Sequence, residues 1–297
     1  MKKLLKTQRH DTPHWVGNGF PVRPVFGYND LAHSISPFLL MDYAGPAEFT
    51  PTEERRGVGE HPHRGFETVT IVYSGEVEHR DSSGGGGIIR PGDVQWMTAA
   101  GGLVHEEFHG KEYAKKGGKF EMVQLWVNLP RKDKMTKPRY QGIPSAKIPV
   151  VELPKGAGTA RIIAGNFSGK TGPTQTFSPI NLWDIRLKKG ESAEFQVPEG
   201  HTATVFVLEG GNVTVGDDGK ISPAEIGVLE TSGTSFKLTA SKDQDATLLF
   251  LGGEPLNEPI VGYGPFVMNS PGEIRQAFQD FESGKMGSLE KIAGSEY

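Results

Sequence analysis

The sequence predicts an all-β protein, a sandwich or a barrel, with a small helical appendage. Short runs rich in Val, Ile and Phe recur along the 297 residues and are bounded by Gly, Pro, Asp or Asn. The chain has 40 glycines and 21 prolines, about a fifth of its residues, where roughly 12% is usual. This composition has no collagen triplet period, so it indicates many turns that join short strands.

The expected elements follow from these runs. The predicted strands are, in chain order, Thr68–Tyr73, Val94–Met97, Met122–Val127, Arg161–Ala164, Leu182–Leu187, Thr204–Leu208, Ser235–Thr239 and Thr247–Leu251. Near the end of the chain, Ser270 is a good N-cap and Pro271 suits a first helical turn. Ile274, Phe278 and Phe281 then fall on one face, which predicts one amphipathic helix.

Length and internal similarity predict two domains. A chain of 297 residues accommodates two domains of ordinary size. Residues 128–150 are rich in Lys, Arg and Pro and have the composition of a connection. Residues 65–75 can be laid over residues 200–210, and a repeat of this length indicates a duplicated domain. We therefore predict two β domains of the same kind, formed by residues 1–140 and 141–297.

Composition excludes several classes of protein. The chain has 32 basic and 36 acidic residues, a net charge of −4, so no basic surface for direct nucleic-acid binding is expected. It has no cysteine, which excludes disulfides, thiolate nucleophiles, iron–sulfur clusters and cysteine zinc sites. No apolar run approaches the roughly 20 residues of a membrane span, and none follows the N-terminal lysines as in a signal peptide. We expect a soluble, cytoplasmic protein in which any metal is held by His, Asp or Glu.

The histidines are unevenly placed, since eight of the nine lie in the first 109 residues. His61 and His63 are two residues apart, so on a strand both point to the same face. His105 and Glu107 repeat this spacing. An isolated His-x-His pair is more often a solvated loop, but two such pairs on facing strands could place three imidazoles and one carboxylate around one ion. An octahedral ion would keep two positions for substrate or O2.

The types of donor atom limit which metal ions could bind but do not identify one ion. Nitrogen and oxygen donors without a soft ligand suit Fe(II), Mn(II), Ni(II), Zn(II) or Cu(II). Glu67 lies four residues after His63 and keeps the same face of an uninterrupted strand, although Gly65 could interrupt it. Glu67 is therefore a second carboxylate candidate beside Glu107.

A competing motif uses the same residues. His105-Glu106-Glu107-Phe108-His109 matches H-E-x-x-H, in which His105 and His109 on a helix would bind zinc and Glu106 would be the base of a metalloprotease. Glycines bracket the motif closely, a helix there would lack an apolar stripe, and no third ligand follows at a recognisable spacing. The protease remains a remote alternative.

Three motifs resemble the signature of the pirin family. They are His61–Thr70, which reads His-Pro-His-Arg-Gly-Phe-Glu-Thr-Val-Thr, Pro91–Ala99 with a His-x-Glu after it, and Gln124–Pro130. The resemblance covers nearly the whole chain, less distinctively in the second half. Pirins are bicupins, two double-stranded β-helix (jelly-roll) barrels in one chain, which agrees with the duplicated all-β prediction. The resemblance implies one metal ion in the N-terminal cupin, usually Fe(II), with His61, His63, His105 and Glu107 as ligands.

The resemblance also bears on the second domain. The 135-residue offset maps His61 onto Gln196 and His63 onto Pro198, neither of which is a usual metal ligand. We therefore expect the C-terminal cupin to be metal-free.

The resemblance implies two kinds of function. Some bacterial pirins resemble quercetinases, which cleave flavonols with O2. There the metal would lower the pKa of the flavonol 3-hydroxyl, and a carboxylate, Glu107 or Glu67, would take the proton. The flavonolate would react with O2, opening the heterocycle and releasing CO. Other pirins resemble redox-responsive regulatory proteins, in which the iron state would tune binding of a protein partner. A partner whose affinity differs between ferrous and ferric protein would favour the second function.

Overall fold

The structure, a computed structural model, describes residues 1–289 and forms two compact units. The first unit contains residues 11–33, 38–145 and 257–289, and the second contains residues 1–10, 34–37 and 146–256. Each of the eight predicted strand segments lies in a strand, which confirms the all-β prediction. None of the helices among the described residues has the length and apolar character needed to cross a membrane.

The first unit is a barrel built from two antiparallel sheets. Its large sheet has the spatial order β12 (Arg139–Ile143), β9 (Val94–Thr98), β6 (Phe66–Ser74), β11 (Gly118–Asn128), β4 (Phe38–Phe49), β3 (Phe20–Phe26) and β2 (His14–Val16). Its small sheet has the order β5 (Gly57–His63), β10 (Leu103–His109), β7 (Val77–Asp81) and β8 (Gly86–Ile89). The first seven residues of β6 are all buried, as expected of a strand covered on both faces.

The second unit repeats this architecture. Its large sheet has the order β1 (Leu4–Gln8), β22 (Ile226–Leu229), β19 (Thr202–Glu209), β24 (Ala246–Gly253), β17 (Ile180–Leu187), β14 (Gly158–Ala164) and β13 (Val150–Glu152). Its small sheet has the order β18 (Ser192–Gln196), β23 (Ser235–Ala240), β20 (Val213–Val215) and β21 (Gly219–Ile221). The match of both strand orders makes β5 the counterpart of β18 and β10 the counterpart of β23, which confirms two cupin barrels.

Short elements complete the two barrels. Two hairpins pair β15 (Asn166–Phe167) with β16 (Lys170–Thr171) and β25 (Val261–Tyr263) with β26 (Phe266–Met268). Within residues 1–289 the named helices are α1 (Lys111–Lys116), α2 (Pro271–Glu282) and the 3-10 turns η1 (Leu31–Ser34), η2 (Arg131–Asp133), η3 (Ser145–Lys147) and η4 (Pro154–Gly156).

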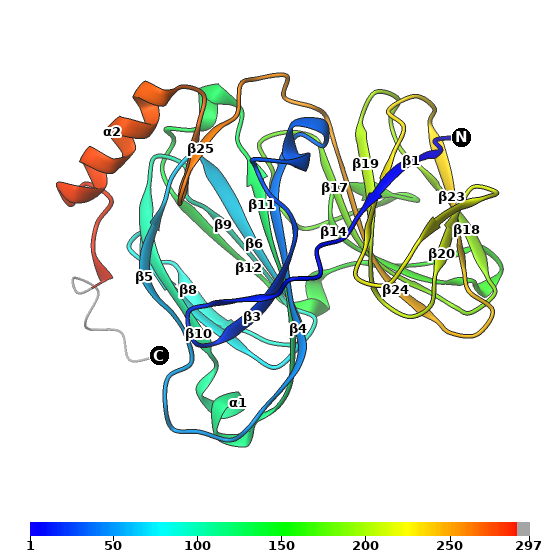
Figure 1. The fold of residues 1–297 in the computed structure, drawn as a ribbon, viewed down its shortest axis with the longest axis horizontal. Helices are drawn as coiled ribbons and strands as arrows, with labels where there is room; N and C mark the ends of the chain where they lie inside the picture. The colour runs from blue at the N-terminus through cyan, green and yellow to red at the C-terminus, as the bar shows by residue number, and fades with distance from the viewer. Residues whose placement is uncertain (290–297) are drawn as a thin grey trace. The chain divides into compact units, whose positions relative to one another are not determined.

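The two units do not follow the predicted division at residue 140, because each end of the chain belongs to the unit opposite to the predicted one. The change between the units in mid-chain falls at residues 145 and 146, but residues 1–10 belong to the second unit and residues 257–289 to the first. The reason at the N-terminus is pairing, because β1 adds to β22 at the edge that β12 occupies in the first unit. Figure 1 shows β1 in blue beside the yellow strands of the second unit. Residues 290–297 of the predicted second domain lie outside the described residues.

The predicted helix is present as α2, but its buried face differs from the prediction. The Ser270 side chain accepts a hydrogen bond from the backbone N–H of Glu273, as an N-cap should. Ile274 is buried and Phe278 packs partly against the same cluster, but Phe281 is 38% exposed. Asp280 takes the inner position instead, because its carboxylate accepts a hydrogen bond from Arg64 at 2.9 Å.

Candidate metal centre

Three neighbouring strands of the small sheet each carry two polar residues at alternate positions. On one side of β10, His61 lies opposite His105. On the other side, Asp81 lies opposite His105 and His79 lies opposite Glu107. Alternate residues of a strand share one face, so the pairs on β5, β10 and β7 converge. The predicted pairing of His-x-His with His-x-Glu is therefore present.

The three predicted imidazoles lie close together with their Nε2 atoms available. The ring centroids of His61, His63 and His105 are 4.2 to 4.9 Å apart. His61 Nδ1 lies 2.8 Å from the carbonyl oxygen of Gly59, and His63 Nδ1 lies 3.3 Å from that of Pro265. A carbonyl oxygen only accepts, so both Nδ1 atoms carry hydrogen and both Nε2 atoms keep a lone pair. His105 Nε2 is buried and finds no hydrogen-bond partner among the described residues.

Burial keeps two of these rings neutral. Burial, followed by the neighbouring His61, lowers the pKa of His63 well below its usual range. The pKa of His105 is lowered in the same way by burial and by the rings of His61 and His63. Metals bind the neutral imidazole, so both rings are in the form that can act as ligands. The buried, unpartnered Nε2 of His105 fits a divalent ion bound at this place.

The candidate ligand atoms form two groups that share His105. Those of His61, His63 and His105 lie within 4.8 Å of one another, and so do those of His79, His105 and Glu107. Glu107 is 5% exposed, and its Oε1 lies 3.4 Å from the hydroxyl oxygen of Thr70. The structure thus brings the four predicted residues together and adds His79.

The site opens onto a cavity of about 350 Å³ in the first unit, within the range of small-molecule pockets. His61, His63 and Glu107 lie in its wall. The remaining lining is mainly apolar and consists of Val16, Phe20, Val22, Leu40, Val58, Met122 and Trp126, with Asp42 and Gln124 as further polar groups. A second cavity, of about 610 Å³, lies in the second unit and is lined largely by uncharged polar residues, with none of the predicted ligands.

A row of polar side chains crosses the large sheet, and two of them, Asp42 and Gln124, line this cavity. Asp42 is in register with Gln124, and Gln124 is in register with Thr70. The Thr70 hydroxyl donates to Gln124 Oε1 at 2.7 Å. Burial raises the pKa of Asp42 to about 7. The cavity therefore has, besides Glu107 of the candidate ligand group, a second carboxyl group that can be protonated near neutral pH.

Glu67, the alternative carboxylate, does not face the cavity. It alternates along β6 with Thr70, whose side chain reaches Gln124 and Glu107, so Glu67 points to the other face of the sheet. There its Oε1 accepts a hydrogen bond from Thr98 at 2.7 Å, and burial raises its pKa to about 7. Sequence spacing alone could not exclude it, because Gly65 lies between His63 and Glu67 and ends the continuity of the strand.

The metalloprotease alternative is wrong, because its motif lies on strand β10 and not on a helix. Alternation turns Glu106 to the opposite face from His105, where Arg80 donates to it at 2.6 Å. His109 packs between the rings of Phe49 and Phe120 and donates its Nε2 hydrogen to the carbonyl of Gly19. Glu106 therefore cannot act as the base, and His109 cannot act as a zinc ligand, in the site that the motif predicts.

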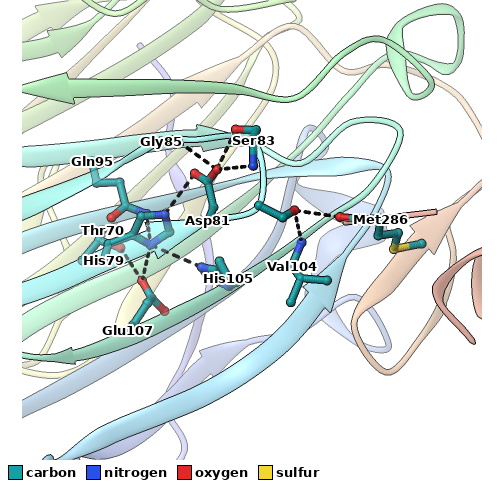
Figure 2. Close-up of polar contacts among 11 residues, drawn as sticks. Thr70, His79, Asp81, Ser83, Gly85, Gln95, Val104, His105, Glu107 and Met286 are labelled. Carbon is teal, nitrogen blue, oxygen red and sulfur yellow. Dashed lines mark hydrogen bonds and ion pairs between the residues drawn. The ribbon is translucent and has the colours of Figure 1, made fainter. Parts of the chain in front are cut away.

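His79 is the residue that sequence reasoning missed. Its ring lies between His105 and Asp81, with Gln95 and Glu107 beside it (Figure 2). The signal that could have found it is the spacing of His79 and Asp81, which repeats the His-x-acid pattern of His105 and Glu107.

Comparison with known proteins identifies the family. The profile of the Pirin family matches residues 19–127, and that of the Pirin C-terminal cupin domain matches residues 182–287. The chain belongs to the pirin family. It is 55% identical over 285 residues to a Pseudomonas aeruginosa protein named "Putative quercetin 2,3-dioxygenase", covering 96% of this chain and 98% of that protein.

Solved pirin structures share the fold. This pirin superposes with a TM-score of 0.94 on the crystal structure of a quercetin 2,3-dioxygenase from Acinetobacter baumannii, at 53% identity, covering 97% of this chain and 99% of that one. A bacterial pirin from Escherichia coli, in complex with nickel(II), matches with a TM-score of 0.61 at 20% identity, covering 84% and 99% of the two chains. The second match is evidence for the fold alone.

Proposed function

We propose that this pirin is a metal-dependent oxygenase of the quercetin 2,3-dioxygenase type, which cleaves flavonols with O2. The observation that carries the proposal is the cluster of His61, His63 and His105, with Glu107 grouped beside His105, next to a largely apolar cavity. His61, His63 and Glu107 lie in the wall of that cavity. Such a site offers an ion together with space for an aromatic substrate. The names of the Pseudomonas and Acinetobacter relatives support the same substrate class.

We assign the metal to His61, His63, His105 and Glu107. These groups supply three nitrogen donors and one oxygen donor, which suit Fe(II) and also Mn(II), Ni(II), Zn(II) or Cu(II). Fe(II) is our first choice for an oxygenase. The Escherichia coli pirin, described as a nickel(II) complex, indicates that this fold also accepts nickel.

Glu107 and Thr70 would handle the proton of the substrate hydroxyl. A divalent ion bound here would lower the pKa of a flavonol hydroxyl. Glu107 would take the proton of that hydroxyl on a carboxylate oxygen released from the ion, because it is the carboxylate that both faces the cavity and belongs to a candidate ligand group. Protonated Glu107 can donate to the Thr70 oxygen 3.4 Å away, since the Thr70 hydrogen is engaged with Gln124.

The other cavity walls position the substrate. Trp126 and Phe20 offer apolar surface to a flat aromatic ring. Asp42 and Gln124 offer hydrogen bonds to a further hydroxyl group, and a flavonol such as quercetin carries several. The apolar lining also keeps water from the reacting carbon atoms.

Product analysis tests the proposal. Metal-loaded protein incubated with quercetin in air should release CO in proportion to the O2 consumed, and His63→Ala should abolish both. Glu67→Gln is the matched control, because it changes a carboxyl group that lies on the other face of β6. Turnover that persists in His63→Ala protein proved to be metal-free would refute the proposal.

A further inference from the structure

Two buried residues beside the ligand strand have no task in the chemistry proposed above. His79 and Asp81 lie on β7, opposite Glu107 and His105, and are 2% and 0% exposed. Burying an imidazole and a carboxylate costs free energy unless both are hydrogen-bonded. Their hydrogen bonds therefore show what the pair does.

Asp81 sets the direction of these hydrogen bonds. Its Oδ1 accepts from the backbone N–H and the hydroxyl of Ser83 at 2.8 and 2.6 Å, and from the N–H of Gly85 at 3.1 Å. Burial alone would raise the pKa of Asp81, but the hydrogen bonds from His79 and Ser83 lower it below its usual range. The ionised Oδ2 lies 3.3 Å from His79 Nε2, so that nitrogen carries the hydrogen and donates it.

The tautomer of His79 determines which nitrogen of His105 carries the hydrogen. Because its hydrogen is on Nε2, a neutral His79 has a lone pair on Nδ1. That atom lies 3.3 Å from His105 Nδ1, so His105 donates with Nδ1 and keeps its lone pair on Nε2. The amide of Gln95 also donates to His79 Nδ1, at 3.3 Å, so the two donors share this lone pair. Figure 2 shows this row from His105 through His79 to Asp81.

We propose that His79 and Asp81 form a relay that fixes the tautomer of His105 and makes it a stronger metal ligand. An imidazole that donates its second N–H to a base is held in orientation and becomes more basic. Greater basicity favours Fe(III) over Fe(II), so the relay lowers the midpoint potential of bound iron. His79 and Asp81 are thus positioning residues, and the proposal rests on the metal centre proposed above.

A direct ligand role for His79 is the rival interpretation. His79 Nδ1 lies 3.3 Å from His105 Nδ1 and 4.0 Å from Glu107 Oε1, so an ion could be held by these three residues. In that arrangement His105 would bind through Nδ1, and its buried Nε2 would still lack a partner. The relay leaves Nε2 for the ion and accounts for every nitrogen, which is why we favour it.

The experiment measures Ni(II) affinity and the iron midpoint potential in four variants of the full chain. Asp81→Asn and His79→Leu break the relay, and His79→Gln keeps an amide oxygen that can accept from His105. Glu106→Gln is the matched control, because it removes a carboxylate from the same strand as His105 on the opposite face. The relay predicts an affinity loss of about 10- to 100-fold for Asp81→Asn and His79→Leu, partly restored in His79→Gln.

The midpoint potential separates a relay from a packing effect. If a variant loses tenfold more affinity for Fe(III) than for Fe(II), its potential rises by about 59 mV. We expect a rise in Asp81→Asn and His79→Leu but not in Glu106→Gln. If Asp81→Asn and His79→Leu have the same potentials and affinities as Glu106→Gln, the relay is refuted. Complete loss of Ni(II) binding in a folded His79→Leu variant would also refute it, because His79 would then be a metal ligand. A wild-type protein that binds neither ion would instead refute the metal centre itself.

Discussion

His61 and His105 face each other across the ladder of β5 and β10, with ring centroids 4.2 Å apart. The ladder has an irregularity at this point, since His105 pairs with His61 but Glu107 pairs with Val58. An extra residue on one strand re-aims the side chains next to it. A slip of one residue would turn the proposed ligands of one strand away from those of the other, so the proposed metal centre depends on the pairing register.

Metal content distinguishes the assigned ligands from the other histidine of β10. We expect His61→Ala to lose the metal, because it removes one of three clustered nitrogen donors. His109→Gln should keep the metal, because His109 donates to Gly19 within an aromatic cluster. The measurement is metal per chain after dialysis. Retention in His61→Ala together with loss in His109→Gln would reverse the assignment.

The two buried carboxylates Glu107 and Glu67 should differ in their effect on turnover. Glu107→Gln removes the carboxylate that we assign both as proton acceptor and as metal ligand, so kcat should fall by about 100-fold or more, as is usual for loss of a general base. Glu67→Gln should retain near wild-type kcat, because that side chain bonds to Thr98 on the far face. Equal losses in the two variants would show that Glu107 has no special role.

The stability of the metal-free protein should depend on pH through Asp42. Its pKa is about 7 in the folded protein, against about 3.9 for an unperturbed Asp, so the folded state holds a proton that the unfolded state has lost. Stability from this group is therefore full below about pH 4 and falls until about pH 7, by at most about 4 kcal/mol. Asp42→Asn removes this loss, so its stability relative to wild type should rise between pH 4 and pH 8.

Denaturant unfolding at several pH values checks this prediction. Asp243→Asn is the control, because it removes the same charge from an exposed position. Metal-free samples are needed, since a bound cation would itself lower the pKa of a nearby carboxyl group. A difference between Asp42→Asn and wild type that does not change with pH would contradict the prediction.

One metal ion per chain is expected, because aromatic rings fill the second barrel. Trp183 stacks on Phe250, Phe250 on Phe236, and Phe236 on Phe195, with centroids 4.5 to 5.2 Å apart. Phe195 and Phe236 lie on β18 and β23, the counterparts of the ligand strands β5 and β10. Elemental analysis should give one equivalent in wild type and none in His61→Ala. A second equivalent that survives His61→Ala would place a site elsewhere.

The fold was largely accessible from the sequence because its signals are local. Runs of β-branched and aromatic residues between glycines predict strands, and the spacing of His61 and His63 places both on one face. The 135-residue offset predicted the duplication but not its details. It maps His61 onto Gln196, which is exposed, whereas the neighbouring Phe195 points into the core of the second barrel.

The missed features depend on pairing between distant segments. The His-x-Asp spacing of His79 and Asp81 is visible in the sequence, but nothing near it shows that β7 lies beside β10 and brings His79 to His105. Asp42 is one acidic residue in an apolar strand, and its cavity exists only when β4, β11 and β5 close the barrel. The buried face of α2 is likewise set by Arg64, far away in the chain, which bonds to Asp280.

The most direct test of the account is O2 uptake by protein loaded stepwise with Fe(II) and supplied with quercetin, with metal content measured on each sample. The account predicts uptake in proportion to bound iron, reaching a plateau at one ion per chain. Full iron occupancy without O2 uptake would contradict a quercetinase and would favour a regulatory protein whose iron state controls the binding of a partner.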